Sequence, residues 1–317
     1  MEVNRRGFLR LSGAALASGV FVPWSMPEVQ SSPQDRVGIL YDSSKCIGCR
    51  ACQMACKRWN KLPQETEVAE TLPAEAANVY KLYDTPRDLS ADTWTLIKLN
   101  KRSETDWHFM NYQCMHCADA ACVTVCPSGA LYKDERGFTA YDKSKCIGCG
   151  YCTQFCPYGV PALKTKSVLS GEAKAAKCTF CQDRVFSGIG GPFCAETCPV
   201  GALVWGSRAE LLEAAKSRVE HLKSQGLGSV RLYGEHEAGG LGRLSIMFGE
   251  PGDYGWPVSP STPAVARAWQ DILQPLGTLA FGAAGLGCSP STSSPGAVSR
   301  WRKSNDRQQG PRGAGSG

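Results

Sequence analysis

The sequence predicts an α+β protein built from two related halves. Two short segments of the first half recur in the second: residues 45–49 (KCIGC) return at 145–149, and residues 126–131 (CPSGAL) return at 198–203 as CPVGAL. Sixteen of the 17 cysteines form four groups of four, in which the first spacing returns in the third group. Hydrophobic residues make up 43% and charged residues 20% of the 317 residues, which is ordinary for a globular protein and excludes wholesale disorder.

The spacing within the four cysteine groups indicates iron–sulfur clusters. The first and third groups are C-x2-C-x2-C-x3-C, the second is C-x2-C-x4-C-x3-C and the fourth is C-x2-C-x12-C-x3-C. Such a run, followed by Pro, is the bacterial ferredoxin signature, in which three cysteines bind one cluster and the fourth binds another. The sequence therefore predicts tandem bacterial-ferredoxin-like halves that bind four [4Fe–4S] clusters, with an insertion in the first half. The groups are Cys46, Cys49, Cys52 and Cys56; Cys114, Cys117, Cys122 and Cys126; Cys146, Cys149, Cys152 and Cys156; and Cys178, Cys181, Cys194 and Cys198.

Two other uses of cysteine fit this pattern less well. Thiols only two residues apart cannot all reach partners in good disulfide geometry. Structural zinc usually takes two C-x2-C pairs separated by a loop, which the fourth group resembles and the run C-x2-C-x2-C does not. A zinc-stabilised binding module stays open as an alternative from another class. In the cluster interpretation, Gly48 and Gly148 let the backbone approach the cluster closely.

Charge excludes a nucleic-acid partner. The net charge is +6, but residues 288–317 carry +4 of it and residues 1–36 carry +1, which leaves +1 for the middle of the chain. That is too little for the positive field that nucleic-acid binding requires.

The segments around the cysteines resemble one family, the four-cluster iron–sulfur subunits of molybdopterin oxidoreductases. Within it, the chain most resembles the beta subunit of membrane-bound formate dehydrogenase, and the iron–sulfur subunit of periplasmic nickel–iron hydrogenase is a close relative. The segments span about residues 37–286. They are 46–60 (CIGCRACQMACKRWN), 83–99 (YDTPRDLSADTWTLIKL), 114–131, 146–161, 177–184 (KCTFCQDR) and 231–240 (RLYGEHEAGG).

The resemblance implies a crosswise pairing of the groups, first with fourth and second with third. One departure from the signature is that Lys57, and not Pro, follows Cys56. The implied ligands are Cys46, Cys49, Cys52 and Cys198 for cluster 1; Cys56, Cys178, Cys181 and Cys194 for cluster 2; Cys114, Cys117, Cys122 and Cys156 for cluster 3; and Cys126, Cys146, Cys149 and Cys152 for cluster 4.

The N-terminus predicts export in the folded state. Arg5 and Arg6 precede Phe8-Leu9 and an apolar stretch from Leu11 to Val22, as in a twin-arginine signal. We expect residues 1–36 to be this signal with a linker, and the periplasmic side of the cytoplasmic membrane to be the destination. The twin-arginine route suits a protein whose clusters are inserted in the reducing cytoplasm.

The remaining segments of the chain are expected to have structural roles and no catalytic residues. Residues 37–205 are the expected four-cluster domain, with an insertion at 57–113 that contains a strand near 93–99. Residues 206–267 are the expected helix and extension that pack on a partner subunit, the helix beginning with a capping box of Ser207 and Glu210. Residues 268–287 contain an apolar run from Pro275 to Gly287 that is short for a membrane anchor, so a truncated anchor and an interfacial helix are both open. Residues 288–317, with the lone Cys288, should be a disordered tail.

No catalytic site is evident in the sequence, and the resemblance implies an electron-transfer subunit. It implies a catalytic subunit with molybdenum or tungsten as electron donor, a membrane cytochrome b and quinone as acceptors, and the twin-arginine translocase as a transient partner. Outside the ligands, Lys45, Lys145 and Lys177 each precede a cysteine, as charge compensation for a cluster or as surface lysines. Packing is the favoured role of Trp59, Trp94, Trp107 and Trp205, and His116 is not expected to be a ligand.

Overall fold

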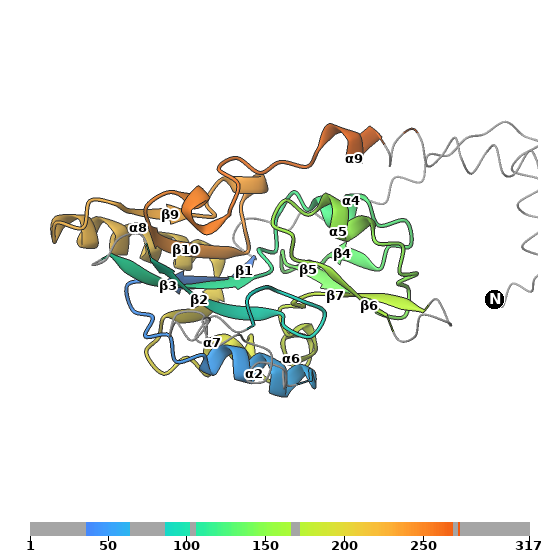
Figure 1. The fold of residues 1–317 in the computed structure, drawn as a ribbon, viewed down its shortest axis with the longest axis horizontal. Helices are drawn as coiled ribbons and strands as arrows, with labels where there is room; N and C mark the ends of the chain where they lie inside the picture. The colour runs from blue at the N-terminus through green and yellow to red at the C-terminus, as the bar shows by residue number, and fades with distance from the viewer. Residues whose placement is uncertain (1–35, 64–85, 102–105, 166–171, 269–271, 273–317) are drawn as a thin grey trace, which may run out of the picture. The chain divides into compact units, whose positions relative to one another are not determined.

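The computed structural model describes residues 36–63, 86–101, 106–165, 172–268 and 272 (Figure 1). The chain divides into two compact units, residues 1–263 and 264–317. The elements below belong to the first unit; in the second, the structure describes α9 (Ala264–Ala268). The expected anchor at 268–287 and the expected tail at 288–317 lie almost entirely outside the described residues. Within the described part of the chain, no helix combines the length and hydropathy needed to cross a bilayer.

A four-stranded sheet joins the start of this unit to its end. Its order is β8 (Leu203–Ser207), β1 (Val37–Asp42), β10 (Arg243–Phe248) and β9 (Val230–Tyr233). β1 runs parallel to β10 and antiparallel to β8. The domain boundary expected between residues 205 and 206 therefore falls inside β8, and the extension after it supplies two strands to the sheet.

Alternation along β1 gives the sheet two buried faces. Leu40 faces α8 (Arg208–Ser224) and packs with Ala215, Val219 and Leu222 of that helix. Ile39 and Tyr41, on either side of Leu40 in the strand, face the opposite way, into the larger core that also contains cysteines. The sheet thus separates a purely structural helix from the side on which the cysteines lie.

The helix α8 confirms the expected helix but not its expected cap. Ser207 makes no side-chain hydrogen bond to the first turn, so the capping box with Glu210 is wrong. Ser207 is instead the last residue of β8, paired with Val37 of β1, and the strand continues directly into the helix. The helix ends before Gly226, whose φ of 88° is one that glycine adopts readily.

Three small hairpins complete the strands of the unit. β2 (Thr95–Lys101) and β3 (Trp107–Gln113) lie in the expected insertion, where β2 begins two residues later than the strand expected from the sequence. β4 (Leu131–Lys133) pairs with β5 (Thr139–Tyr141), and β6 (Ala162–Thr165) pairs with β7 (Ala173–Ala176).

Five short helices carry or adjoin the cysteines. They are α2 (Ala51–Asn60), α4 (Ala121–Thr124), α5 (Tyr151–Phe155), α6 (Gln182–Phe186) and α7 (Phe193–Glu196). Two turns of 3-10 helix, Glu237–Gly239 and Pro251–Tyr254, flank the end of the sheet.

Candidate metal centres

Each of the four C-x3-C pairs lies on or beside a short helix. Residues four apart on a helix share a face, so Cys52 and Cys56, which both lie in α2, leave that helix on the same side. In the other three pairs the second cysteine follows the end of the helix. Helix α2 packs against α7, and α4 packs against α5, as Figure 1 also shows. Because α2 carries the first cysteine group and α7 the fourth, this packing brings those two groups together. The pair α4 and α5 does the same for the second and third groups.

Two thiol quartets form around α2 and α7. Burial, followed by the charges of Cys46, Cys198 and Cys49, raises the pKa of Cys52 to about 12. Burial also raises the pKa of Cys194, and there the neighbouring charges are those of Cys178, Cys56 and Cys181. Each thiol therefore has as its main thiol neighbours the three that the resemblance implies for its cluster.

The other two quartets each line one cavity. Cys114, Cys117, Cys122 and Cys156 line the first cavity, together with His116 and Lys177. Cys126, Cys146, Cys149 and Cys152 line the second, together with Tyr141. All sixteen cysteines are free thiols. The thiol neighbours and the two cavities thus agree with the four groups of four that the resemblance implies, although the described residues include no set of three or more metal-ligating side chains close enough to hold a single metal ion.

Backbone N–H groups point at sulfur in the same way in both halves. Leu131 N donates to Cys126 Sγ at 3.5 Å, and Leu203 N donates to Cys198 Sγ at 3.4 Å. These two leucines end the repeated CPxGAL segments, so the repeat in sequence is a repeat in geometry. Such N–H groups stabilise negative charge on cluster sulfur.

Glycines make room for this backbone arrangement. Gly48 and Gly148 have φ of 70° and 73°, which favours glycine at both equivalent positions. A Cβ on Gly148 would lie 2.3 Å from the carbonyl oxygen of Ala173 on β7. The loop of the third cysteine group therefore packs directly on the β6–β7 hairpin.

The quartets follow one another in a row. The first and second meet on α2, where Cys52 and Cys56 are one turn apart. The second meets the third where Cys178 and Cys114 pack in one cluster of buried residues, and the third meets the fourth where the charge of Cys152 acts on Cys122. The exposed thiols are Cys49 in the first quartet and Cys149 in the fourth, so the row has an exposed thiol at each end.

Buried cations show that this interior suits an anionic group. Lys177 is 1% exposed and donates to the carbonyl oxygens of Thr139 and Cys178, and Arg243 is fully buried and donates to the carbonyl oxygen of Asn111. Arg243 Nε has no hydrogen-bond partner among the described residues. Burying a cation without a counter-charge costs several kcal/mol, which a cluster held by four thiolates would offset. Soft thiolate donors are also the ligands that iron–sulfur clusters use. The residues present therefore fit the cluster.

The three lysines that precede cysteines have different environments. Lys177 is buried, whereas Lys45 and Lys145 are exposed. Lys145 lies 3.7 Å from Asp142 in a surface ion pair. The position before a cysteine is thus not sufficient for charge compensation, and only Lys177 faces the cluster cavities.

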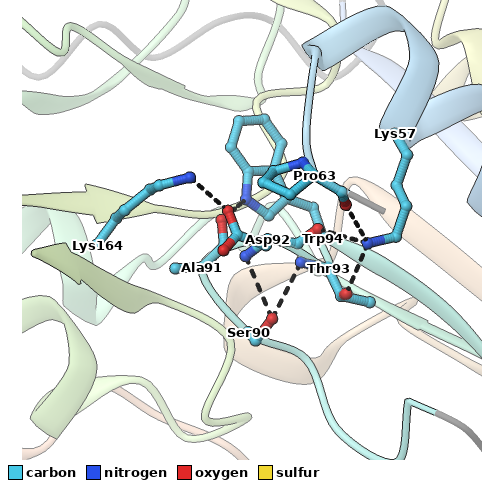
Figure 2. A network of polar contacts seen from close by, with 8 residues as sticks. All are labelled: Lys57, Pro63, Ser90, Ala91, Asp92, Thr93, Trp94 and Lys164. Atoms are coloured by element: carbon cyan, nitrogen blue, oxygen red, sulfur yellow. Dashed lines mark hydrogen bonds and ion pairs between the residues drawn. The ribbon is translucent and has the colours of Figure 1, made fainter. Parts of the chain in front are cut away.

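Lys57, at the departure from the ferredoxin signature, fastens α2 to the insertion. Its Nζ donates to the carbonyl oxygens of Pro63 and Asp92, at 3.0 and 2.9 Å, and to Thr93 Oγ1 at 3.2 Å. On the other side of the same loop, Lys164 of β6 pairs with the Asp92 carboxylate at 2.6 Å. Figure 2 shows both lysines converging on the loop around Asp92. The insertion thereby links the helix of the first cysteine group to the hairpin beside the third.

The remaining singled-out residues are mostly packing residues. Trp59 donates to Asp183 and packs edge-on against Phe193 of α7, and Trp94 packs against the core that contains Cys114 and Cys178. Trp107 and Trp205 are 51% and 38% exposed. His116 is fully buried at φ 49°, and its Nδ1 accepts the Thr139 N–H. Burial lowers the pKa of His116 well below its usual value.

Sequence reasoning missed three residues beside the cysteines: Tyr41, Tyr141 and Arg243. Tyr41 and Tyr141 precede equivalent cysteines and are marked by an extended repeat, since YDSSKCIGC returns as YDKSKCIGC. Arg243, by contrast, has no such signal, because its place beside the cysteines depends on β10 pairing with a strand about 200 residues away.

Comparison with known proteins agrees with this geometry. Residues 45–130 and 105–208 each match a family model described as a 4Fe–4S dicluster domain. Two dicluster domains and sixteen cysteines correspond to four [4Fe–4S] clusters. The protein is therefore an electron-transfer protein with tandem ferredoxin-like domains, and it is not catalytic alone. A [4Fe–4S] cluster supplies one-electron transfer, and the surrounding chain sets its potential through burial, charge and hydrogen bonds.

Individual relatives identify which family of iron–sulfur proteins the chain belongs to. The formate dehydrogenase-O iron–sulfur subunit of Escherichia coli is 34% identical over 260 residues, which cover 79% of this chain and 80% of the relative. The formate dehydrogenase iron–sulfur subunit of Haemophilus influenzae is 35% identical over 254 residues, covering 78% and 77%. The hydrogenase-2 operon protein HybA of Shigella flexneri is 31% identical over 281 residues, covering 78% and 82%. The chain belongs to the family of formate dehydrogenase iron–sulfur subunits.

Proposed function

We propose that this chain is the electron-transfer subunit of a membrane-associated formate dehydrogenase. In this role it relays electrons from a molybdopterin-containing subunit, with molybdenum or tungsten, to a membrane cytochrome b and the quinone pool. The observation that carries the proposal is the row of four thiol quartets with an exposed thiol at each end. Electrons can enter such a row at one end and leave at the other without crossing a wide gap.

The proposed ligands follow the quartets. Cluster 1 is held by Cys46, Cys49, Cys52 and Cys198, and cluster 2 by Cys56, Cys178, Cys181 and Cys194. Cluster 3 is held by Cys114, Cys117, Cys122 and Cys156, and cluster 4 by Cys126, Cys146, Cys149 and Cys152. The support is the proximity of these thiols and the packing of α2 on α7 and of α4 on α5.

The proposal extends to the ends of the chain. Residues 1–36 serve as a twin-arginine signal, which takes the folded, cluster-loaded protein to the periplasmic side of the membrane through the twin-arginine translocase. The extension after β8 presents a surface to the catalytic subunit, and residues 268–287 contact the membrane. The support for export is the Arg5-Arg6 pair with its apolar stretch.

A second candidate is the iron–sulfur subunit of a periplasmic nickel–iron hydrogenase. The similarity to HybA, at 31% identity, favours it. The four-cluster row would be the same, and only the electron donor would differ. The zinc-module alternative loses its basis with the 4Fe–4S family matches.

One experiment separates these candidates. The tagged chain is purified from native membranes in mild detergent, and dye reduction is assayed separately with formate and with hydrogen. Formate-driven reduction with a copurifying molybdenum or tungsten subunit supports the proposal. Hydrogen-driven reduction with nickel in the complex assigns the chain to the hydrogenase branch. A colourless protein that contains zinc and no iron contradicts both.

A further inference from the structure

Two tyrosines occupy equivalent places in the two halves. Tyr41 lies five residues before Cys46, and Tyr141 lies five residues before Cys146. Tyr41 pairs with Leu203 across β1 and β8, and Tyr141 pairs with Leu131 across β5 and β4. The partners are the leucines whose N–H groups point at Cys198 and Cys126. The first and fourth quartets are therefore built on the same frame, each with a tyrosine at the same register.

The hydroxyl groups of these two tyrosines have different partners. The hydroxyl of Tyr41 also lies within reach of a thiol, that of Cys46, but it donates its single proton to the carbonyl oxygen of Phe109 on β3, at 2.7 Å. The hydroxyl of Tyr141 is buried and makes no hydrogen bond of good geometry with the described residues, but it lies within reach of the Cys146 thiol. A buried hydroxyl without a partner is unfavourable, so a group that accepts its proton is expected at this place.

The surroundings of Tyr141 identify that acceptor. Tyr141 is only 8% exposed, and it lines the cavity formed by the four thiols of the fourth quartet. Its backbone N–H and carbonyl are both held by the Gln182 side chain, at 2.9 and 2.8 Å, which fixes where the ring can lie. The hydroxyl thus lies at a cavity lined by four thiols and by Ser128, whose own hydroxyl is 3.8 Å from Cys126 Sγ.

We infer that the Tyr141 hydroxyl donates a hydrogen bond to a sulfur of cluster 4 and raises the reduction potential of that cluster, whereas Tyr41 gives cluster 1 no such bond. The inference rests on the cluster ligands proposed above. The physical reason is that reduction adds negative charge to the cluster, so a donor aimed at its sulfur stabilises the reduced state more than the oxidised state.

The test compares Tyr141→Phe with its matched control, Tyr41→Phe. Each change removes a single oxygen atom and keeps the ring, so packing is preserved in both. The intact complex in detergent is titrated potentiometrically and followed by electron paramagnetic resonance. The signal of cluster 4 is assigned beforehand with Cys149→Ser, which alters a ligand of that cluster.

Tyr141→Phe should lower the potential of cluster 4 and leave the other three potentials in place. The expected change in the oxidised-to-reduced ratio at a fixed potential is up to about tenfold, or about 59 mV for a one-electron couple. In deuterated buffer, one exchangeable deuteron coupled to cluster 4 should also be lost in Tyr141→Phe, while those of the backbone N–H groups of Leu131 and Ala175 remain. Tyr41→Phe should keep this deuteron and all four potentials.

Two results overturn the inference while leaving the proposed function intact. One is an unchanged cluster 4 potential in Tyr141→Phe with iron and sulfide for four clusters. The other is an equal shift of cluster 1 in Tyr41→Phe, which would mean that the two tyrosines act alike. A wild-type complex with fewer than four clusters, or with no formate-driven reduction, would instead contradict the proposed function. Cluster content and formate-driven reduction are therefore measured on the wild-type complex separately.

Discussion

Lys177 should control the potentials of the two inner clusters. Its Nζ is buried and donates to the carbonyl oxygens of Cys178 and Thr139 at 2.9 and 3.0 Å. Cys178 belongs to the second quartet, and Lys177 also lines the cavity of the third. Its charge lowers the pKa of Cys122, in opposition to the larger effect of burial, which raises that pKa to about 12. One cation thus lies where two clusters meet.

The magnitude follows from Coulomb's law. At a separation of about 8 Å and an effective dielectric constant of about 20, a unit charge interacts with an added electron by roughly 2 kcal/mol. For a one-electron couple this corresponds to about 90 mV, since about 59 mV accompanies each tenfold change. Lys177→Met, which removes the charge and keeps the length of the side chain, should lower the potentials of clusters 2 and 3 by several tens of millivolts.

The control for Lys177→Met is Lys145→Met, because Lys145 also precedes a cysteine but is exposed and paired with Asp142. Solvent screens such a charge, so the control should shift no potential by more than a fraction of that amount. Both variants are titrated as purified complexes by electron paramagnetic resonance, with iron counted first. Loss of the cation leaves two carbonyl oxygens unpaired at a cost of about 1–3 kcal/mol each, so Lys177→Arg is included to test whether a cation restores the potentials. Unchanged inner potentials in Lys177→Met with four clusters present, or equal shifts in the control, would refute the argument.

Three further predictions test the ligands, the backbone and the export signal. Cys198→Ser should damage the cluster held by Cys46, Cys49 and Cys52, which are distant in sequence, and leave the cluster of Cys178, Cys181 and Cys194 intact. Cys288→Ser is the control. Loss of only the cluster held by Cys178, Cys181 and Cys194 would refute the crosswise pairing. Gly148→Ala should destabilise the protein by about 2–5 kcal/mol, from its positive φ and from a contact of 2.3 Å with Ala173, whereas Gly150→Ala, with φ 81° and its nearest contact at 3.4 Å, should cost about 1–2 kcal/mol. The melting temperatures of the two variants test this difference, and equal values would show that the β6–β7 hairpin moves to accommodate the added methyl group. Changing Arg5 and Arg6 to Lys should keep folded, cluster-loaded protein in the cytoplasm, as cell fractionation would show; normal arrival in the periplasm would exclude the signal.

Local sequence patterns account for much of the site. The cysteine spacing predicts the four ligand groups, and the structure has a short helix on or beside the C-x3-C pair of each group. The apolar spacing from Leu211 to Leu222 predicts α8, which packs on the sheet through those positions. These features depend on residues close together in the chain, so they can be predicted from short-range sequence patterns.

Long-range packing accounts for what the sequence does not predict. Lys45, Lys145 and Lys177 stand in the same local context, yet only Lys177 is buried, because the strand before it ends inside the protein. Arg243 reaches the cysteines because β10 pairs in parallel with β1, and no pattern within β10 specifies that pairing. The hydrogen bond of Tyr41 is also a long-range feature. Its hydroxyl donates to a carbonyl oxygen in the insertion, which the second half lacks.

The distribution of charge differs between the ends and the middle of the row. Arg243 acts on Cys194 and Cys178, Lys177 on Cys178 and Cys122, and Lys133 on Cys117 and Cys122, all in the second and third quartets. The outer quartets have fewer such cations, namely Arg243 with its smaller effect on Cys52 and Lys174 beside Cys146. The first and fourth quartets instead each contain an exposed thiol. Water and mobile ions can stabilise an added electron at an exposed cluster, but a buried cluster depends on charges that the protein supplies. Fixed cations beside the inner clusters therefore supply the stabilisation of an added electron that water supplies at the two ends.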